Sequence, residues 1–267
     1  MTRLGVCGWP VAHSRSPQMH NAALRAAGLD GWRYLRLPVP PDLFAETVRA
    51  LPAAGFRGVN VTIPHKEAAL ALADEASGPA CEIGAANTLT FEDGRILAEN
   101  TDAPGFLEAL PRAPAGERAL VLGAGGSARA VVWALVRAGA ADVAVWNRTP
   151  ERARALAADL GATAVERITD VPPLVVNCTS IGLLDEADPF KALPLGADSL
   201  GAGSLVVDMV YRAGGTRLLE AARTRGARVV DGLEILVAQG AASFERWTGL
   251  EAPREAMREA ATTIAET

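Results

Sequence analysis

The chain has 267 residues, of which 49% are hydrophobic and 21% charged, as in a globular protein with a sizeable core. Its net charge of -5 and the absence of basic clusters argue against nucleic-acid and membrane-surface partners and favour a small-molecule ligand. It has no apolar run of the length found in a signal peptide or a membrane span, so a cytoplasmic protein is expected.

Short apolar runs alternate with helical patterns in the first part of the chain. Strands are predicted at LGVCGW, YLRLPV and GVNVTI, and helices at about residues 17–27 and 41–54. The segment FEDGRI has an Asp-Gly turn between apolar flanks, which predicts a hairpin. This alternation indicates βαβ units and a mostly parallel sheet.

A second alternating unit starts near residue 119. Strands are predicted at 119–122 and 143–146 and within LVVNCT, SLVVDMV and ARVVDG, followed by a helical stretch from Leu233 to the C-terminus. The strongest boundary signals are the segment 102–105, DAPG, and the dipeptide Asp231-Gly232. The fold class is therefore α/β.

A glycine-rich loop, GAGGSA, follows the first strand of the second unit and opens a predicted helix. It departs from G-x-G-x-x-G only in its last position, where alanine still permits close helix packing. Such a loop lets the backbone approach a pyrophosphate at the helix N-terminus. A tight turn without a ligand is the alternative. The residues expected at the dinucleotide are Gly123, Ala124, Gly125, Gly126, Ser127 and Ala128.

The residues after the next strand favour NADP over NAD. NAD-specific proteins carry an acid there, whereas this chain has Asn147, Arg148 and Thr149, followed by Arg152. A guanidinium can pair with a 2'-phosphate in bidentate fashion. Arg154 is interpreted as part of the solvated face of the following helix.

Polar residues interrupt the apolar pattern of the first part. Ser14 and Ser16 precede a helix, where hydroxyls and free amides suit a carboxylate, although N-capping would explain Ser16 alone. Asn60 and Thr62 leave one face at a strand end, the side where open α/β sheets bind ligands. Further short polar groups follow apolar segments at Asn87, Asn100, Thr101 and Asp102. This set suits a small polyhydroxylated ligand.

Lys66 and Lys191 are the only lysines in a chain whose other cations are arginines. Arginine does not surrender its proton, whereas a lysine can exchange one. We therefore interpret Lys66 as an acid/base residue. A structural ion pair is the alternative.

These segments together resemble the shikimate dehydrogenase family. The resemblance lies in GWPVAHSRSPQMHN, NVTIPHKE, GAANTL, NTDAPGF, GAGGSARA, NRTPERA, NCTSIG and QGAASFERWTG, which follow the family's order over nearly the whole chain. It implies two α/β domains flanking a cleft: a substrate-binding catalytic domain at 1–102 plus 233–267, and an NADP-binding Rossmann-like domain with a doubly wound parallel sheet at 103–232. The implied reaction is the reversible reduction of 3-dehydroshikimate to shikimate by NADPH, on the route to aromatic amino acids.

The resemblance also implies roles for individual residues. Lys66 and Asp102 would form the catalytic pair. The residues implied at the substrate are Ser14, Ser16, Asn60, Thr62, Asn87, Tyr211 and Gln239, and those added at the cofactor are Thr179, Met209 and Gly232. One departure is Ala213, where the family usually has proline.

Other readings stay open at this point. One alternative is a quinate/shikimate dehydrogenase that uses NAD, and another is a non-catalytic NADPH-binding sensor on the same scaffold. Cys7, Cys81 and Cys178 lack metal-ligand spacing, so no metal is expected. A monomer or a homodimer is expected.

Overall fold

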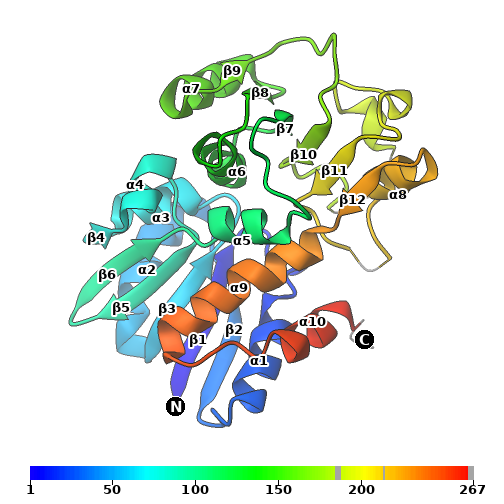
Figure 1. Cartoon of the computed structure of the whole chain (residues 1–267). Helices are drawn as coiled ribbons and strands as arrows, with labels where there is room; N and C mark the ends of the chain where they lie inside the picture. Colours follow the sequence, from blue (N-terminus) through cyan, green and yellow to red (C-terminus); the bar gives the residue numbers. More distant parts are fainter. Residues whose placement is uncertain (184–187, 213, 264–267) are drawn as a thin grey trace. The chain divides into compact units, whose positions relative to one another are not determined.

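The computed structural model describes residues 1–183, 188–212 and 214–263 (Figure 1). Ala213 thus lies outside the described residues. The chain divides into two compact units, Met1–Gly105 with Leu236–Thr267 and Phe106–Ile235. The sequence places the corresponding boundaries at residues 102 and 232. Each unit is built on its own six-stranded sheet in the described part of the chain, which confirms the α/β class.

The sheet of the first unit has the strand order β2-β1-β3-β5-β6-β4. Its strands are β1 (Thr2–Gly8), β2 (Trp32–Pro38), β3 (Phe56–Val61), β4 (Glu75–Ala76), β5 (Thr88–Glu92) and β6 (Arg95–Glu99). β1 pairs in parallel with β2 and β3, but β5 is antiparallel to both β3 and β6. The predicted hairpin is confirmed, with positive φ at Asp93 and Gly94 in its turn. Because the hairpin reverses the chain, this sheet is mixed, but three of its five strand pairings among the described residues are parallel, as the alternation of strands and helices predicts.

Helices of the first unit pack on this sheet and on one another. They are α1 (Ser16–Ala26), α2 (Phe44–Ala50), α3 (Lys66–Leu72), α4 (Gly78–Ile83) and α10 (Arg254–Thr262), with α5 (Asp102–Ala109) and α9 (Gly232–Thr248) shared with the second unit. α1 packs against α10. The helix predicted at 41–54 is instead a short helix between two 3-10 turns, Pro41–Leu43 and Pro52–Ala54. Pro52 offers no N–H to continue the helix.

The sheet of the second unit is parallel throughout, in the order β12-β11-β10-β7-β8-β9. Its strands are β7 (Arg118–Leu122), β8 (Asp142–Trp146), β9 (Thr163–Ala164), β10 (Leu174–Asn177), β11 (Leu205–Asp208) and β12 (Arg228–Val230). The helices α6 (Gly126–Arg137), α7 (Pro150–Leu160) and α8 (Arg217–Thr224) follow strands of this sheet. The chain moves outward from β7 to β9 and then returns to β10 on the other side of β7. This reversal is the place where doubly wound sheets bind their ligands.

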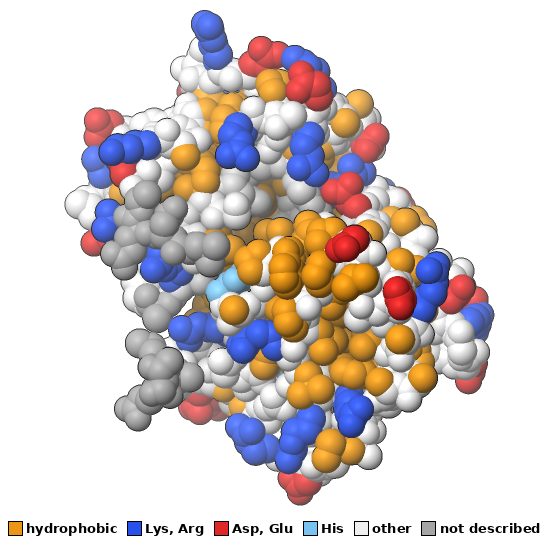
Figure 2. Space-filling model, turned by 180° about the vertical axis from the view of Figure 1, so that it is seen from behind, with side chains coloured by type: hydrophobic (Ala, Val, Ile, Leu, Met, Phe, Trp, Pro, Cys, Tyr) orange, Lys and Arg blue, Asp and Glu red, His pale blue; other side chains and the backbone are white. Residues whose placement is uncertain are grey.

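Apolar side chains gather on the face of the molecule drawn in Figure 2. The exposed large apolar residues of the first unit include Trp9, Leu43 and Ile63, from the segments that follow β1, β2 and β3. Within residues 1–183, 188–212 and 214–263, none of the helices has the length and hydropathy needed to span a bilayer.

Candidate active site

A buried ion pair joins Lys66 and Asp102 in the first unit. Lys66 is the first residue of α3 and Asp102 is the first residue of α5. Nζ of Lys66 donates to Oδ2 of Asp102 at 2.6 Å, and the two residues are 8% and 5% exposed. The chain leaves strand geometry before Lys66, since His65 precedes α3 as its N-cap and its Nε2 lies 2.8 Å from the Val39 carbonyl oxygen. The structure therefore brings the two predicted catalytic residues together.

An amide cluster holds the other oxygen of Asp102. Nδ2 of Asn87 donates to Oδ1 of Asp102 at 3.0 Å, and it also lies 2.9 Å from the Thr101 hydroxyl and 3.2 Å from Oε1 of Gln239. Oδ1 of Asn87 accepts the backbone N–H of Thr101 at 2.7 Å. Because that N–H can only donate, it sets the orientation of the Asn87 amide and points its NH₂ group at Asp102.

Asn60 lies next to this cluster and is satisfied by protein groups. Its Oδ1 accepts from the hydroxyl of Tyr34 at 2.7 Å, and its Nδ2 donates to the Thr88 hydroxyl at 3.2 Å and to the Asn87 carbonyl at 3.3 Å. Ser243 of α9 lies 3.5 Å from the same Oδ1. Tyr34, Thr88 and Ser243 were not identified from the sequence, where the only signal is a hydroxyl group directly before a leucine or a phenylalanine.

The two serines of the HSRSP segment have different partners. Oγ of Ser14 accepts the backbone N–H of Ser16 at 3.3 Å, and both serines are buried. α1 begins at Ser16 after Arg15, without a side-chain cap from the described residues, so the capping alternative for Ser16 is wrong. Nη2 of Arg36 donates to the Ser14 carbonyl at 2.8 Å. The hydroxyls of Ser16 and Thr62 make no hydrogen bond within the described residues, which leaves them available to a ligand.

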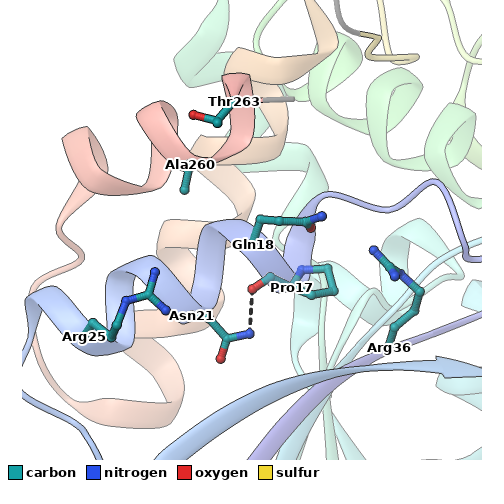
Figure 3. A pocket seen from close by; sticks show the side chains of 7 residues that line it. All are labelled: Pro17, Gln18, Asn21, Arg25, Arg36, Ala260 and Thr263. Carbon is teal, nitrogen blue, oxygen red and sulfur yellow. Dashed lines mark hydrogen bonds between the residues drawn. The ribbon is translucent and has the colours of Figure 1, made fainter. Parts of the chain in front are cut away.

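A hollow of about 530 Å³ lies on the first unit behind this segment (Figure 3). Figure 3 shows Asn21 turned toward Pro17, whose carbonyl accepts its Nδ2 at 2.7 Å. The hollow is lined by Pro17, Gln18, Asn21, Arg25, Arg36, Ala260 and Thr263. None of the residues expected at the substrate lines this hollow. Arg36, which does line it, donates a hydrogen bond to the Ser14 carbonyl. Burial and the positive charge of Arg36 lower the pKa of nearby His13.

The glycine-rich loop of the second unit has the geometry that a pyrophosphate requires. Gly123 has φ 113°, and a Cβ there would lie 3.0 Å from the carbonyl carbon of Cys178, so only glycine fits. A Cβ on Gly125 would meet no described atom within 4 Å, which leaves space beside the loop. α6 begins at Gly126 with no acid in its first turn and no side-chain cap from the described part of the chain. A helix N-terminus of this kind suits an anion.

The arginines after β8 differ in what they contact. Arg154 pairs with Glu151 and Glu166, as the interpretation of a solvated helix face predicts. Arg148 and Arg152 are exposed, and their side chains make no ion pair or hydrogen bond within the part of the chain that the structure describes. Nδ2 of Asn147 donates to the Thr149 carbonyl at 2.9 Å, which shapes the turn before α7.

The remaining predicted residues of the second unit surround the carboxyl ends of β10 and β11. The backbone N–H and the hydroxyl of Thr179 both donate to Oδ1 of Asn177, at 3.1 and 2.7 Å. Tyr211 is half-buried in the segment that follows Met209. A Cβ on Gly232 would lie 2.7 Å from the Asp208 carbonyl oxygen and 2.8 Å from that of Met209, so this contact requires glycine. The structure does not bring together groups of His, Cys, Asp and Glu that could hold a metal ion, within the residues it describes.

Comparison with known proteins identifies the family. The model of the shikimate dehydrogenase substrate binding domain matches residues 6–89, that of shikimate / quinate 5-dehydrogenase matches 109–179, and that of the shikimate 5'-dehydrogenase C-terminal domain matches 232–262. A shikimate dehydrogenase (NADP(+)) of Thermus thermophilus is 48% identical over 265 residues, covering 98% of each chain. The chain belongs to the shikimate dehydrogenase family.

Solved structures of family members have the same fold. The shikimate dehydrogenase of Aquifex aeolicus superposes with a TM-score of 0.91 at 38% identity, covering 98% of each chain. A Thermus thermophilus enzyme solved in complex with NADP(H) and shikimate has a TM-score of 0.87 at 46% identity, again covering 98% of each chain.

Proposed function

We propose that this chain is an NADP-dependent shikimate dehydrogenase, an oxidoreductase that acts on a CH–OH group. It reversibly reduces 3-dehydroshikimate to shikimate with NADPH, a step of aromatic amino acid biosynthesis by way of chorismate. The observation that carries this proposal is the buried Lys66–Asp102 pair inside an ordered amide cluster. A relative that is 48% identical to this chain is named shikimate dehydrogenase (NADP(+)), which supports the proposal.

Hydride transfer to a ketone creates negative charge on the ketone oxygen, so the site needs a proton donor. Lys66 supplies that proton through Nζ and takes it back in the reverse direction. Asp102 holds Nζ in place and offers its carboxylate to the neighbouring substrate hydroxyl, while Asn87 keeps the carboxylate oriented. General acid/base help of this kind contributes about a hundred- to ten-thousand-fold in rate.

The other predicted residues divide between the two units. In the substrate-binding catalytic domain, Ser14 and Ser16 bind the substrate carboxylate. Thr62, Asn60, Asn87 and Gln239 lie near its hydroxyl groups, and Tyr211 acts at the carboxylate.

The second unit fits NADP on three observations. The N-terminus of α6 has no side-chain cap, the space beside Gly125 is open, and Arg148 and Arg152 are available to pair with a 2'-phosphate, as far as the described residues go. When bound, NADPH supplies the hydride. Thr179, Met209 and Gly232 complete its site at the ends of β10 and β11. The protein acts in the cytoplasm as a monomer or a homodimer.

The test is nicotinamide absorbance during incubation of the purified protein with shikimate, quinate or no substrate, each with NADP or NAD. Reduction with shikimate and NADP, and not with the other pairs, is the expected result. Comparable turnover with quinate or NAD would make the protein a quinate/shikimate dehydrogenase. Tight NADPH binding without turnover in any mixture would make it a sensor and refute the proposed activity.

A further inference from the structure

The second unit contains a buried carboxylate that the proposed mechanism does not use. Asp208, the last residue of β11, is fully buried. Its Oδ1 accepts from the N–H of Val210 at 3.0 Å and from Nδ2 of Asn177 at 2.9 Å, and its Oδ2 accepts from the hydroxyl of Thr216 at 2.6 Å. No lysine or arginine pairs with it among the residues that the structure describes. Within that part of the chain, neutral donors alone therefore stabilise its charge.

Asp208 sets the orientation of the Asn177 side chain. Asn177 is the last residue of β10, beside β11 in the sheet, and it is also buried. A carboxylate can only accept hydrogen bonds, so the NH₂ group of Asn177 must face Asp208. Its Oδ1 is then left to accept both the N–H and the hydroxyl of Thr179. The Thr179 oxygen in turn accepts the N–H of Ile181 at 3.2 Å.

The same carboxylate holds both ends of the segment that carries Tyr211. Val210 lies directly before Tyr211, and Thr216 is the N-cap of α8, where its oxygen accepts the N–H of Leu219. Gly232 packs against the backbone carbonyls of residues 208–210. The two oxygens of Asp208 therefore bind the start and the end of this segment.

We infer that Asp208 is a positioning residue for two of the ligand contacts of the second unit, Thr179 and Tyr211. Through Asn177 it orients Thr179, which is assigned to the cofactor, and through Val210 and Thr216 it places Tyr211, which is assigned to the substrate carboxylate. These two assignments rest on the proposed function. Asp208 itself touches neither ligand.

The protonation of Asp208 makes the inference testable by pH. Ligand affinity should change with the charge of this carboxyl group, which is not expected of a residue that only stabilises the fold. Burial raises the pKa of Asp208 to about 6; its three hydrogen bonds oppose this rise, and the negative charge of Asp231, in the turn before α9, adds to it. Asn177 and Thr216, which face it from β10 and the start of α8, are neutral. A protonated carboxyl accepts more weakly and brings a donor close to the N–H of Val210 and the NH₂ group of Asn177, which can only donate, so the network weakens below about pH 6.

The experiment compares the wild type with Asp208→Asn between about pH 5 and pH 8. NADP affinity is measured by calorimetry and the KM for shikimate by turnover. In the variant both are expected to weaken about tenfold at the upper pH, because one charge-assisted hydrogen bond is lost. Wild-type affinity for NADP should fall more steeply below about pH 6 than that of the variant, in which the 2'-phosphate of NADP still titrates in this range but residue 208 does not. The control is Asp198→Asn, a substitution of the same type at a side chain that is 97% exposed, and it should behave as the wild type.

A second pair of variants serves if Asp208→Asn does not fold. Thr216→Val removes one hydrogen bond of Asp208, and Thr216→Ser keeps it, so the serine variant should retain the KM for shikimate that the valine variant loses. An unchanged acid fall of NADP affinity in Asp208→Asn would overturn the inference, as would a change confined to one ligand. Calorimetry measures NADP binding without turnover. A wild type that binds NADP but has no activity would refute the proposed function, and the link from Asp208 to Thr179 could still be tested by binding.

Discussion

Lys66 and Asp102 both lie at helix N-termini, and Nζ of the lysine is 2.6 Å from the aspartate. The helix dipole favours a carboxylate at this position but disfavours an ammonium group. Burying the pair also costs solvation free energy that its attraction does not reliably restore. The stability of its own helix therefore does not explain Lys66, which agrees with the proposed role in proton transfer.

Replacing Lys66 by arginine tests proton transfer directly. Lys66→Arg keeps a cation beside Asp102 but removes a group that can surrender its proton. Turnover with shikimate should fall about a hundredfold or more, while the KM for shikimate changes little. Steady-state kinetics at several shikimate concentrations separate the two quantities. Lys191→Arg is the matched control, because Lys191 is exposed on the second unit and should tolerate the change. Near-normal turnover of Lys66→Arg would transfer the proton role to Asp102.

Tyr34 should support the candidate site through its hydroxyl group, which donates to Asn60. Tyr34→Phe removes the 2.7 Å hydrogen bond to Oδ1 of Asn60 but keeps the ring that stacks on His20. The free energy of unfolding should fall by about 1 kcal/mol, and the KM for shikimate should rise a few-fold as the Asn60 amide loosens. Urea denaturation and kinetics measure the two effects. A variant with wild-type KM and lowered stability would show that Tyr34 contributes to folding only.

Local patterns of the sequence were sufficient for most of the fold. Apolar runs at 119–122 and 143–146 became β7 and β8, and the Asp-Gly turn became the hairpin between β5 and β6. The prediction of one helix at 41–54 gave too little weight to proline, because α2 ends before Pro52. The sequence also could not show that α3 starts at Lys66, because a seven-residue helix leaves little periodicity to detect.

The supporting residues of the site were harder to predict because their partners lie far away in sequence. Tyr34 and Asn60 are 26 residues apart, and Asn177 and Asp208 are 31 apart. Pairing of this kind depends on strand order, which a single sequence does not reveal. Asn177 and Asp208 did carry one readable signal, since each ends an apolar strand at the carboxyl edge of a parallel sheet.

Cofactor preference should depend on Arg148 and Arg152, in contrast with Arg154. The first two are exposed without side-chain partners in the described residues, whereas Arg154 is occupied by Glu151 and Glu166. Replacing Arg148 and Arg152 together by alanine should raise the KM for NADP about ten- to a hundredfold and leave the KM for NAD nearly unchanged. Arg154→Ala is the control and should keep the wild-type ratio. An unaltered ratio of the two KM values in the double variant would place the 2'-phosphate elsewhere.

His20 should make the first unit sensitive to acid. The ring is fully buried and stacks on Tyr34 with centroids 4.3 Å apart, and neither ring nitrogen has a hydrogen-bond partner among the described residues. Burial lowers the pKa of His20 from 6.5 to about 3. Between these values the unfolded chain binds the proton and the folded chain does not, so falling pH favours unfolding by up to about 1.4 kcal/mol per pH unit.

The variant His20→Phe removes this linkage and keeps a planar ring against Tyr34. Its free energy of unfolding should exceed that of the wild type by an amount that grows as the pH falls from about 6.5 toward 4. Asp208, whose pKa is raised, contributes a slope of opposite sign over part of this range, but it is present in both proteins and cancels in the difference. Urea denaturation at a series of pH values, followed by tryptophan fluorescence, gives the difference directly. The value near pH 8 reports the packing change alone, and a difference that stays at that value down to about pH 4 would show that His20 takes up its proton in the folded chain.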